Sequence, residues 1–180
     1  DKKDDAGAEA GDNEEAAAEP RTEVKPVKLT DLGPGYRFGI NWSPDAKRLV
    51  FQDNAGRLHL VTIEDAAAGK ATHSVIDTDP WAEGMGVDWA SDSRWIAYSR
   101  SDEGNQNSRI WLHNVETGEK HAVTSAMFES SNPAFDPRGN YLYFQSNRHV
   151  ESAMYSDLDT TWIYANTERL YAAPLRADMK

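Results

Sequence analysis

The histidines are the first residues whose chemistry could mark a catalytic or metal site. They are scattered along the chain, and no pair has the His-Glu-x-x-His spacing that places two imidazoles on one zinc ion. With no cysteine present, thiol catalysis, a cysteine-bound zinc and a disulfide framework are also excluded. The sequence therefore predicts no metal centre from its five histidines, His59, His73, His113, His121 and His149.

Serine and carboxylate patterns lead to the same expectation. No Gly-x-Ser-x-Gly segment is present, so no nucleophile elbow is predicted. Glu151, Asp157 and Asp159 could collect calcium, but their spacing matches no standard calcium loop, and a solvated acidic surface is the favoured interpretation. We expect no catalytic residue, no metal site and no cofactor in this chain.

The charge balance limits the partners that the chain can have. It carries 19 Lys plus Arg against 30 Asp plus Glu, a net charge of -11. Nucleic acids and anionic membrane surfaces require clustered Lys and Arg, so neither is expected as a partner. No apolar run approaches the roughly 20 residues of a membrane helix. Because the absence of cysteine suits a reducing compartment, we expect a cytoplasmic protein, with the periplasm as the alternative.

The first 28 residues differ in composition from the rest. They contain nine acidic and five basic residues but no aromatic residue, Leu, Ile or Met. Such a segment cannot bury enough apolar surface to offset the entropy lost on ordering. We interpret residues 1–28 as a disordered acidic linker, with an acidic binding arm as the alternative.

After Leu29 one pattern occurs three times, as INWSPDAKRLVFQ, VDWASDSRWIAYS and PAFDPRGNYLYFQ. The marker aromatics Trp42, Trp89 and Phe135 are separated by 47 and 46 residues. An interval in the range of roughly 40–50 residues is typical of the blades of a β-propeller. The sequence thus predicts one supersecondary unit used three times.

Each unit contains short strands in a fixed order. In the first unit RFGINW, RLVFQD, RLHLVTI and KATHSVI are separated by turn residues and alternate in polarity. Four antiparallel strands in a unit make a propeller blade. We predict an all-β partial propeller over residues 29–180, with blades of about four strands at 37–76, 84–125 and 130–176.

The marker aromatics could be ligand-stacking platforms or part of the core between blades. Pro44 and Pro137 preset the backbone for the turn that follows, which places each aromatic at the end of a strand. Large rings at that position can wedge between neighbouring sheets. We favour a structural role in the blade core for Trp42, Trp89 and Phe135.

The third unit departs from the pattern. Its second strand, NYLYFQSN, is followed by the next strand, ERLYAAPL, only after an insertion at residues 148–167. Loops of that length are usually functional or packed on another part of the protein. Packing against another domain is favoured over direct contact with a peptide for its candidate residues, Arg148, His149, Tyr155, Asp157, Asp159, Trp162 and Tyr164.

These residues also carry a family resemblance. The run from WASDSRWIAYS to YLYFQSNRH, and then YSDLDTTWIYANTERLYAAPLRAD, resembles the second propeller of tricorn-type serine proteases of the S41 class. Trp-Ser-Pro-Asp alone is shared with TolB-like propellers, whereas the inserted third blade ending in LYAAPLRAD is much more specific. The resemblance extends over roughly Leu29 to Asp178.

The resemblance implies a piece of a large, oligomeric peptidase. In that family an acidic linker can separate two propellers, and a PDZ domain and the catalytic domains follow. The implied partners are therefore the remaining blades of a seven-bladed ring, those downstream domains and peptides, with the catalytic Ser, His and Glu lying outside this chain. The implied function is scaffolding and gating of peptide access; the alternative is a TolB-like protein-binding propeller without peptidase activity.

Three open blades would leave sheet faces and strand edges uncovered. We therefore expect the 180-residue chain, produced alone, to associate with itself. Size-exclusion chromatography with light scattering checks this, and a monodisperse monomer would contradict the expectation that the blades need partners.

Overall fold

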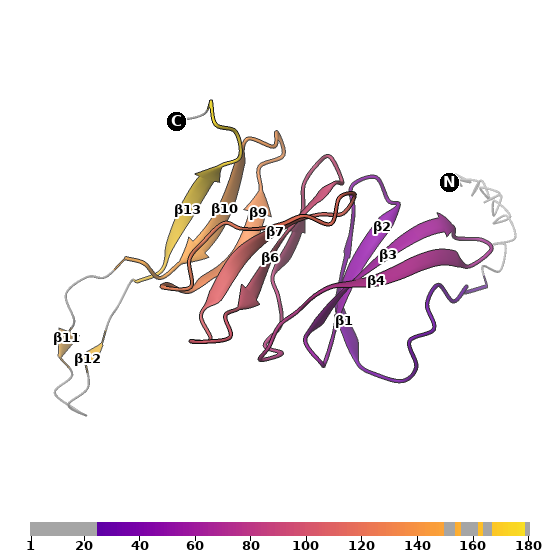
Figure 1. The fold of residues 1–180 in the computed structure, drawn as a ribbon, viewed down its shortest axis with the longest axis horizontal. Coiled ribbons are helices and arrows are strands. Elements are labelled where there is room, and N and C mark those ends of the chain that lie inside the picture. The colour runs from indigo at the N-terminus through magenta and orange to yellow at the C-terminus, as the bar shows by residue number, and fades with distance from the viewer. Residues whose placement is uncertain (1–24, 150–153, 156–161, 164–166, 179–180) are drawn as a thin grey trace, which may run out of the picture.

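The computed structural model describes residues 25–149, 154–155, 162–163 and 167–178. Every regular element in these residues is a β-strand, and the strands form three main antiparallel sheets that follow one another along the chain (Figure 1). The prediction of an all-β partial propeller is confirmed.

The first two sheets are complete four-stranded blades in which sequential strands are neighbours. Connections of three to six residues make this simple meander possible, because antiparallel strands can be joined by tight turns. The first sheet contains β1 (Arg37–Trp42), β2 (Arg48–Asp53), β3 (Arg57–Asp65) and β4 (Lys70–Thr78). The second contains β5 (Val87–Trp89), β6 (Trp95–Ser101), β7 (Ser108–Asn114) and β8 (Lys120–Ala122).

The third sheet differs from the expected four strands. It has three in the described part of the chain, in the order β13-β10-β9. These are β9 (Ser130–Phe135), β10 (Tyr141–Ser146) and β13 (Arg169–Pro174), and the insertion between the last two contains the short pair β11 (Met154–Tyr155) and β12 (Trp162–Ile163). The connection after β10 replaces a tight hairpin, yet β13 still pairs with β10 over six residues in regular register.

The sheets pack face to face, with one apolar layer at each of the two junctions. Val50, Leu58 and Leu60 of the first sheet meet Ile96 and Tyr98 of the second. At the other junction Ala97 and Ile110 of the second sheet meet Leu142 and Phe144 of the third. Because successive strand residues point to opposite faces, the second sheet, which lies between the other two, buries both of its faces.

The three copies use the same repeat positions to face the preceding sheet. Ile96 and Tyr98 pack toward the first sheet, and the equivalent Leu142 and Phe144 pack toward the second. Their counterparts in the first copy are Leu49 and Phe51, which lie on the face of the first sheet that points away from the second. That face therefore has the composition of a blade-to-blade surface.

The marker aromatics follow the same rule with one departure. Trp89 is 5 % exposed and donates a hydrogen bond from Nε1 to the Asn41 carbonyl (3.3 Å), while Phe135 is half-buried against the second sheet. Trp42, by contrast, is 50 % exposed, so the core position expected for it is not buried in this structure. The reason is that Trp42 pairs with Leu49 on the outward face of the first sheet.

Polar side chains tie neighbouring blades together at matching positions. The Asn41 amide donates to the Val87 carbonyl (3.0 Å), and one copy later Asp88 accepts from the Phe135 N–H (2.7 Å). The buried Gln52 side chain both donates to the Met85 carbonyl (2.7 Å) and accepts from the Met85 N–H (2.6 Å). These bonds satisfy backbone groups of the segment entering the second blade.

Replacing Gln52 should loosen the junction between the first two blades. Gln52→Ala leaves both Met85 backbone groups without their partner, and an unsatisfied buried group costs roughly 1–3 kcal/mol. In the full-length parent protein we expect hydrogen exchange of the Met85 amide to accelerate by about tenfold or more. Residue-resolved exchange measures this. Unchanged Met85 exchange, or equal acceleration at the distant Ile110 amide, would contradict a local clamp.

Candidate peptide-binding and interdomain surfaces

The insertion of the third blade contains all of the predicted contact residues, and the structure describes part of it. Tyr155 and Trp162 are antiparallel partners in the β11–β12 pair, so the fold brings these two positions opposite each other. Asp157, Asp159 and Tyr164 lie outside the described residues. His149 is exposed at the start of the insertion.

Arg148 is held within its own blade. Its Nε donates to Ser146 Oγ (3.1 Å), and Nη2 lies 3.4 Å from Ser130 Oγ. The guanidinium also lies over the rings of Phe144 (5.5 Å) and Tyr171 (5.0 Å). Cation–π contacts of this kind stabilise by about 0.5–2 kcal/mol. Arg148 thus anchors the start of the insertion to the blade.

The second and third blades each have an aromatic ring beneath an arginine at the same repeat position. In the second blade Arg109 lies 5.1 Å from the centroid of Trp111, as Arg148 lies over Tyr171 in the third. The first blade has His59 at this position, opposite Phe51 across β2 and β3. The Phe51 and His59 rings stack with centroids 4.6 Å apart.

His59 belongs to a partly buried polar chain that sequence spacing did not reveal. Its Nε2 lies 3.0 Å from Asp53 Oδ2, and its Nδ1 lies 2.8 Å from His73 Nε2. Since the carboxylate only accepts, His59 carries its proton on Nε2 and accepts from His73 through Nδ1. The histidines are scattered along the sequence, but β3 and β4 bring positions 59 and 73 together diagonally across the sheet.

Electrostatics fix the charge of the carboxylate in this chain. Burial raises the pKa of Asp53, but hydrogen bonds from Arg57 and His59 outweigh that effect and hold the pKa well below its usual value. Partial burial of the imidazole, and then the neighbouring His59 and the positive charge of Arg57, lower the pKa of His73. The chain is therefore most stable with Asp53 ionised and His73 neutral.

The two imidazoles of this polar chain are hydrogen-bonded to each other. The residues that the structure describes contain no group of three or more His, Asp or Glu side chains arranged to hold a metal ion. What the arrangement can do is hold β2, β3 and β4 in register on the outward face of the first sheet.

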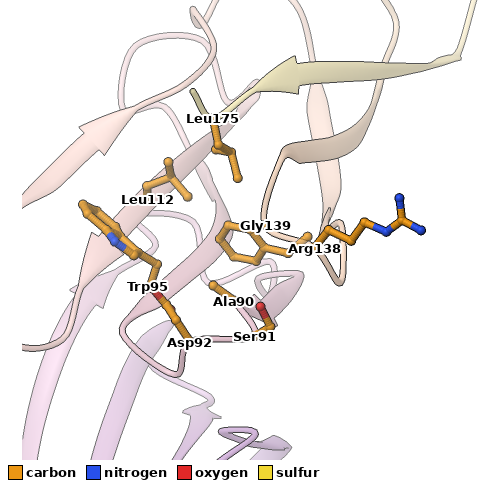
Figure 2. A pocket seen from close by; sticks show the side chains of 9 residues that line it. Ala90, Ser91, Asp92, Trp95, Leu112, Arg138, Gly139 and Leu175 are labelled. Carbon is orange, nitrogen blue, oxygen red and sulfur yellow. The ribbon is translucent and has the colours of Figure 1, made fainter. Parts of the chain in front are cut away.

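A hollow of about 490 Å³ opens between the second and third sheets. It lies beside the turn between β5 and β6, which contains Asp92, and the turn between β9 and β10, which contains Gly139, as Figure 2 shows. Trp95, Leu112, Phe135 and Leu175 form its apolar lining. Neither the turns nor the repeat spacing indicated this hollow, since the residues that line it come from both blades.

Comparison with known proteins identifies the family. The model of the second β-propeller domain of tricorn protease matches residues 7–180. The chain belongs to this family. The match includes the three described blades and begins within the acidic segment at the N-terminus.

Curated relatives are similar over much of the chain. It is 32 % identical over 154 residues to the tricorn protease of Thermoplasma volcanium, a match that covers 81 % of the chain and 14 % of that protein. It is 29 % identical over 112 residues to a tricorn protease homolog of Saccharolobus solfataricus, covering 62 % of the chain and 10 % of the relative. The chain therefore spans a small part of the length of these relatives.

A solved structure shows the same fold. The crystal structure of the tricorn protease matches with a TM-score of 0.67 at 21 % identity, over 81 % of this chain and 14 % of that one. The part of the chain that the structure describes contains no helix that is long and apolar enough to cross a membrane.

The polar chain in the first blade of this tricorn propeller predicts a pH response. Because the folded-state pKa of His73 lies below the unfolded value of 6.5, the unfolded chain binds a proton more readily, and stability is lost as the pH falls below that value. We expect amide exchange in β3, corrected for the intrinsic rate, to be faster at pH 5 than at pH 7.5. His73→Gln should remove most of this difference, whereas His121→Gln in β8 should leave it; equal responses of the two variants would contradict the assignment.

Proposed function

We propose that this chain forms part of the wall of the second propeller of a tricorn-like serine peptidase, where it scaffolds and gates the passage of peptides to or from a catalytic chamber. The observation that carries the proposal is the family match over residues 7–180, because it connects the chain to a protease domain by sequence. The catalytic residues belong to other parts of the parent protein.

The packing of the described blades supports a wall. The second sheet buries both faces, whereas the outward face of the first sheet exposes Ile40 (68 %) and Trp42 (50 %). On the third sheet Tyr143 and Leu170 are exposed. Apolar side chains in such numbers on an outer sheet face are typical of surfaces that another element covers. Further blades of the parent are the proposed partners at both ends.

The remaining partners follow from the same proposal. The insertion would contact a PDZ or catalytic domain of the parent, or the peptide itself, through Tyr155, Trp162 and the residues around them. A homo-oligomeric parent in the cytoplasm belongs to the same proposal. The competing function is a TolB-like protein-binding propeller, and the family match supports the peptidase instead.

A wall predicts that the size of a substrate decides its rate of hydrolysis. We expect the full-length parent protein to hydrolyse short chromogenic peptides and longer unstructured peptides, but not a stably folded protein that contains the same cleavage sequence. Sensitivity to a serine-directed inhibitor should accompany this activity. Absence of peptide hydrolysis by the intact parent would favour the TolB-like alternative.

Loosening the wall should weaken this discrimination. In the parent, Gln52→Ala should raise cleavage of the folded substrate several-fold and leave kcat/KM for a short peptide unchanged, because the clamp on Met85 belongs to the propeller and contains no catalytic group. Lys70→Ala is the control, since Lys70 pairs with Glu64 at an exposed strand end. A Gln52→Ala variant that loses activity on the short peptide, with no change in its rate on the folded substrate, would contradict a role in gating.

A further inference from the structure

We propose that the hollow between the second and third sheets is a binding site for a peptide segment that presents a bulky apolar side chain beside a carboxylate. This proposal goes beyond the wall function, and it does not depend on the chain's parent being a peptidase. The repeat itself supplies the comparison that supports it.

The equivalent place between the first and second sheets is closed by contacts from turn to turn. There the Asp45 N–H donates to Ser93 Oγ (3.0 Å), and Arg48 Nη1 lies 3.4 Å from the Ser93 carbonyl oxygen. Ser93 therefore reaches back from the turn of the second blade and joins the turn of the first. These contacts join the two turns directly across the first junction.

At the second junction the same positions have different residues. Ser93 is replaced by Gly139, which has no hydroxyl, and Arg48 is replaced by Trp95. Asp92 stands where Asp45 stands one copy earlier, and Gly139, which lines the same hollow, offers its N–H no side-chain acceptor in place of Ser93. The result is an opening with a backbone donor at its edge.

The size and lining of the hollow suit part of a peptide. Its volume of about 490 Å³ falls within the range of roughly 300–1,000 Å³ that is usual for ligand pockets. Trp95, Leu112, Phe135 and Leu175 line it. Figure 2 shows the side chains of Trp95, Leu112 and Leu175 on the side opposite the guanidinium of Arg138. A bulky apolar side chain would displace water from this lining, while the Asp92 N–H could bond a peptide carbonyl.

The charged side chains at the rim of the hollow determine which residue is favoured next to the apolar side chain of the peptide. Asp92 is compensated by Arg94, which donates to it from the backbone (2.9 Å) and from Nε (3.3 Å). Arg138 makes no hydrogen bond or ion pair with any residue that the structure describes, and Figure 2 shows it extending away from the apolar lining. An uncompensated arginine beside an apolar hollow, in a chain of net charge -11, is complementary to a carboxylate next to the apolar side chain.

The test uses the full-length parent protein, treated with a serine-directed inhibitor so that no probe is consumed. The probe is a fluorescein-labelled peptide, Gly-Leu-Phe-Asp-Leu-Gly, whose binding is followed by fluorescence anisotropy. Two comparison peptides replace either the apolar residues by Ser or the Asp by Lys. We expect the first replacement to abolish measurable binding and the second to weaken it by about tenfold, as expected for loss of an exposed charge-assisted contact.

Two substitutions of one glycine separate the site from general damage to the fold. Gly139 has φ +70°, but the equivalent Ser93 and Ala46 adopt φ of 59° and 56°, and nothing lies within 4 Å of an added Cβ. Gly139→Ser should rebuild the bond that closes the first junction and raise Kd at least tenfold. Gly139→Ala makes the same demand on the backbone but adds no hydroxyl. This variant should therefore bind the probe nearly as tightly as the wild type does.

Charge reversal at the rim provides the second arm. Arg138→Glu should weaken the Asp-containing probe and strengthen the Lys-containing one. Equal affinities for all three peptides, no binding of any of them to the intact parent, or identical effects of Gly139→Ser and Gly139→Ala would overturn the proposal. Peptide hydrolysis, measured separately without the inhibitor, reports on the wall function and not on this site.

Discussion

Burial of both faces of every blade is the constraint on which the rest of the structure depends. Short strands with apolar residues on both sides give a sheet two apolar faces, and each face needs a neighbouring sheet to cover it. The second blade meets this requirement within the chain, where Ile96 and Tyr98 face one neighbour and Ala97 and Ile110 face the other. The first and third blades meet it on one side.

Polar contacts fix how the blades stack, and differences among these contacts distinguish the two junctions. Asn41 and Asp88 bond the next blade from matching positions, which sets the spacing between the innermost strands. Ala134 takes that position in the third copy and has no polar group for the purpose. At the turns, Ser93 closes the first junction, whereas Gly139 leaves the second open. A repeated scaffold thus acquires an individual feature through one missing side chain.

Much of the fold could be predicted because its signals are local. The turn residues after Trp42, Trp89 and Phe135 recur at fixed intervals, and β1 (Arg37–Trp42) matches the predicted strand at both ends. The meeting of His59 and His73 could not be predicted in this way, because it depends on the register between β3 and β4. The packing of Arg148 on Tyr171 likewise depends on pairing across the insertion. Trp42 is exposed because no other sheet in the described residues covers the outward face of the first blade. The repeat pattern alone does not tell which blade faces have a neighbour.

Oxidative footprinting of two tryptophans in the full-length parent protein tests the central claim most directly. In this structure Trp42 and Trp81 are almost equally exposed, at 50 % and 47 %. Trp42 lies on the outward face of the first sheet, which no other sheet in the described residues covers, whereas Trp81 lies in the connection between β4 and β5. If a further blade covers the first sheet, hydroxyl radicals should modify Trp42 many times more slowly than Trp81. Equal modification of the two residues would contradict the account.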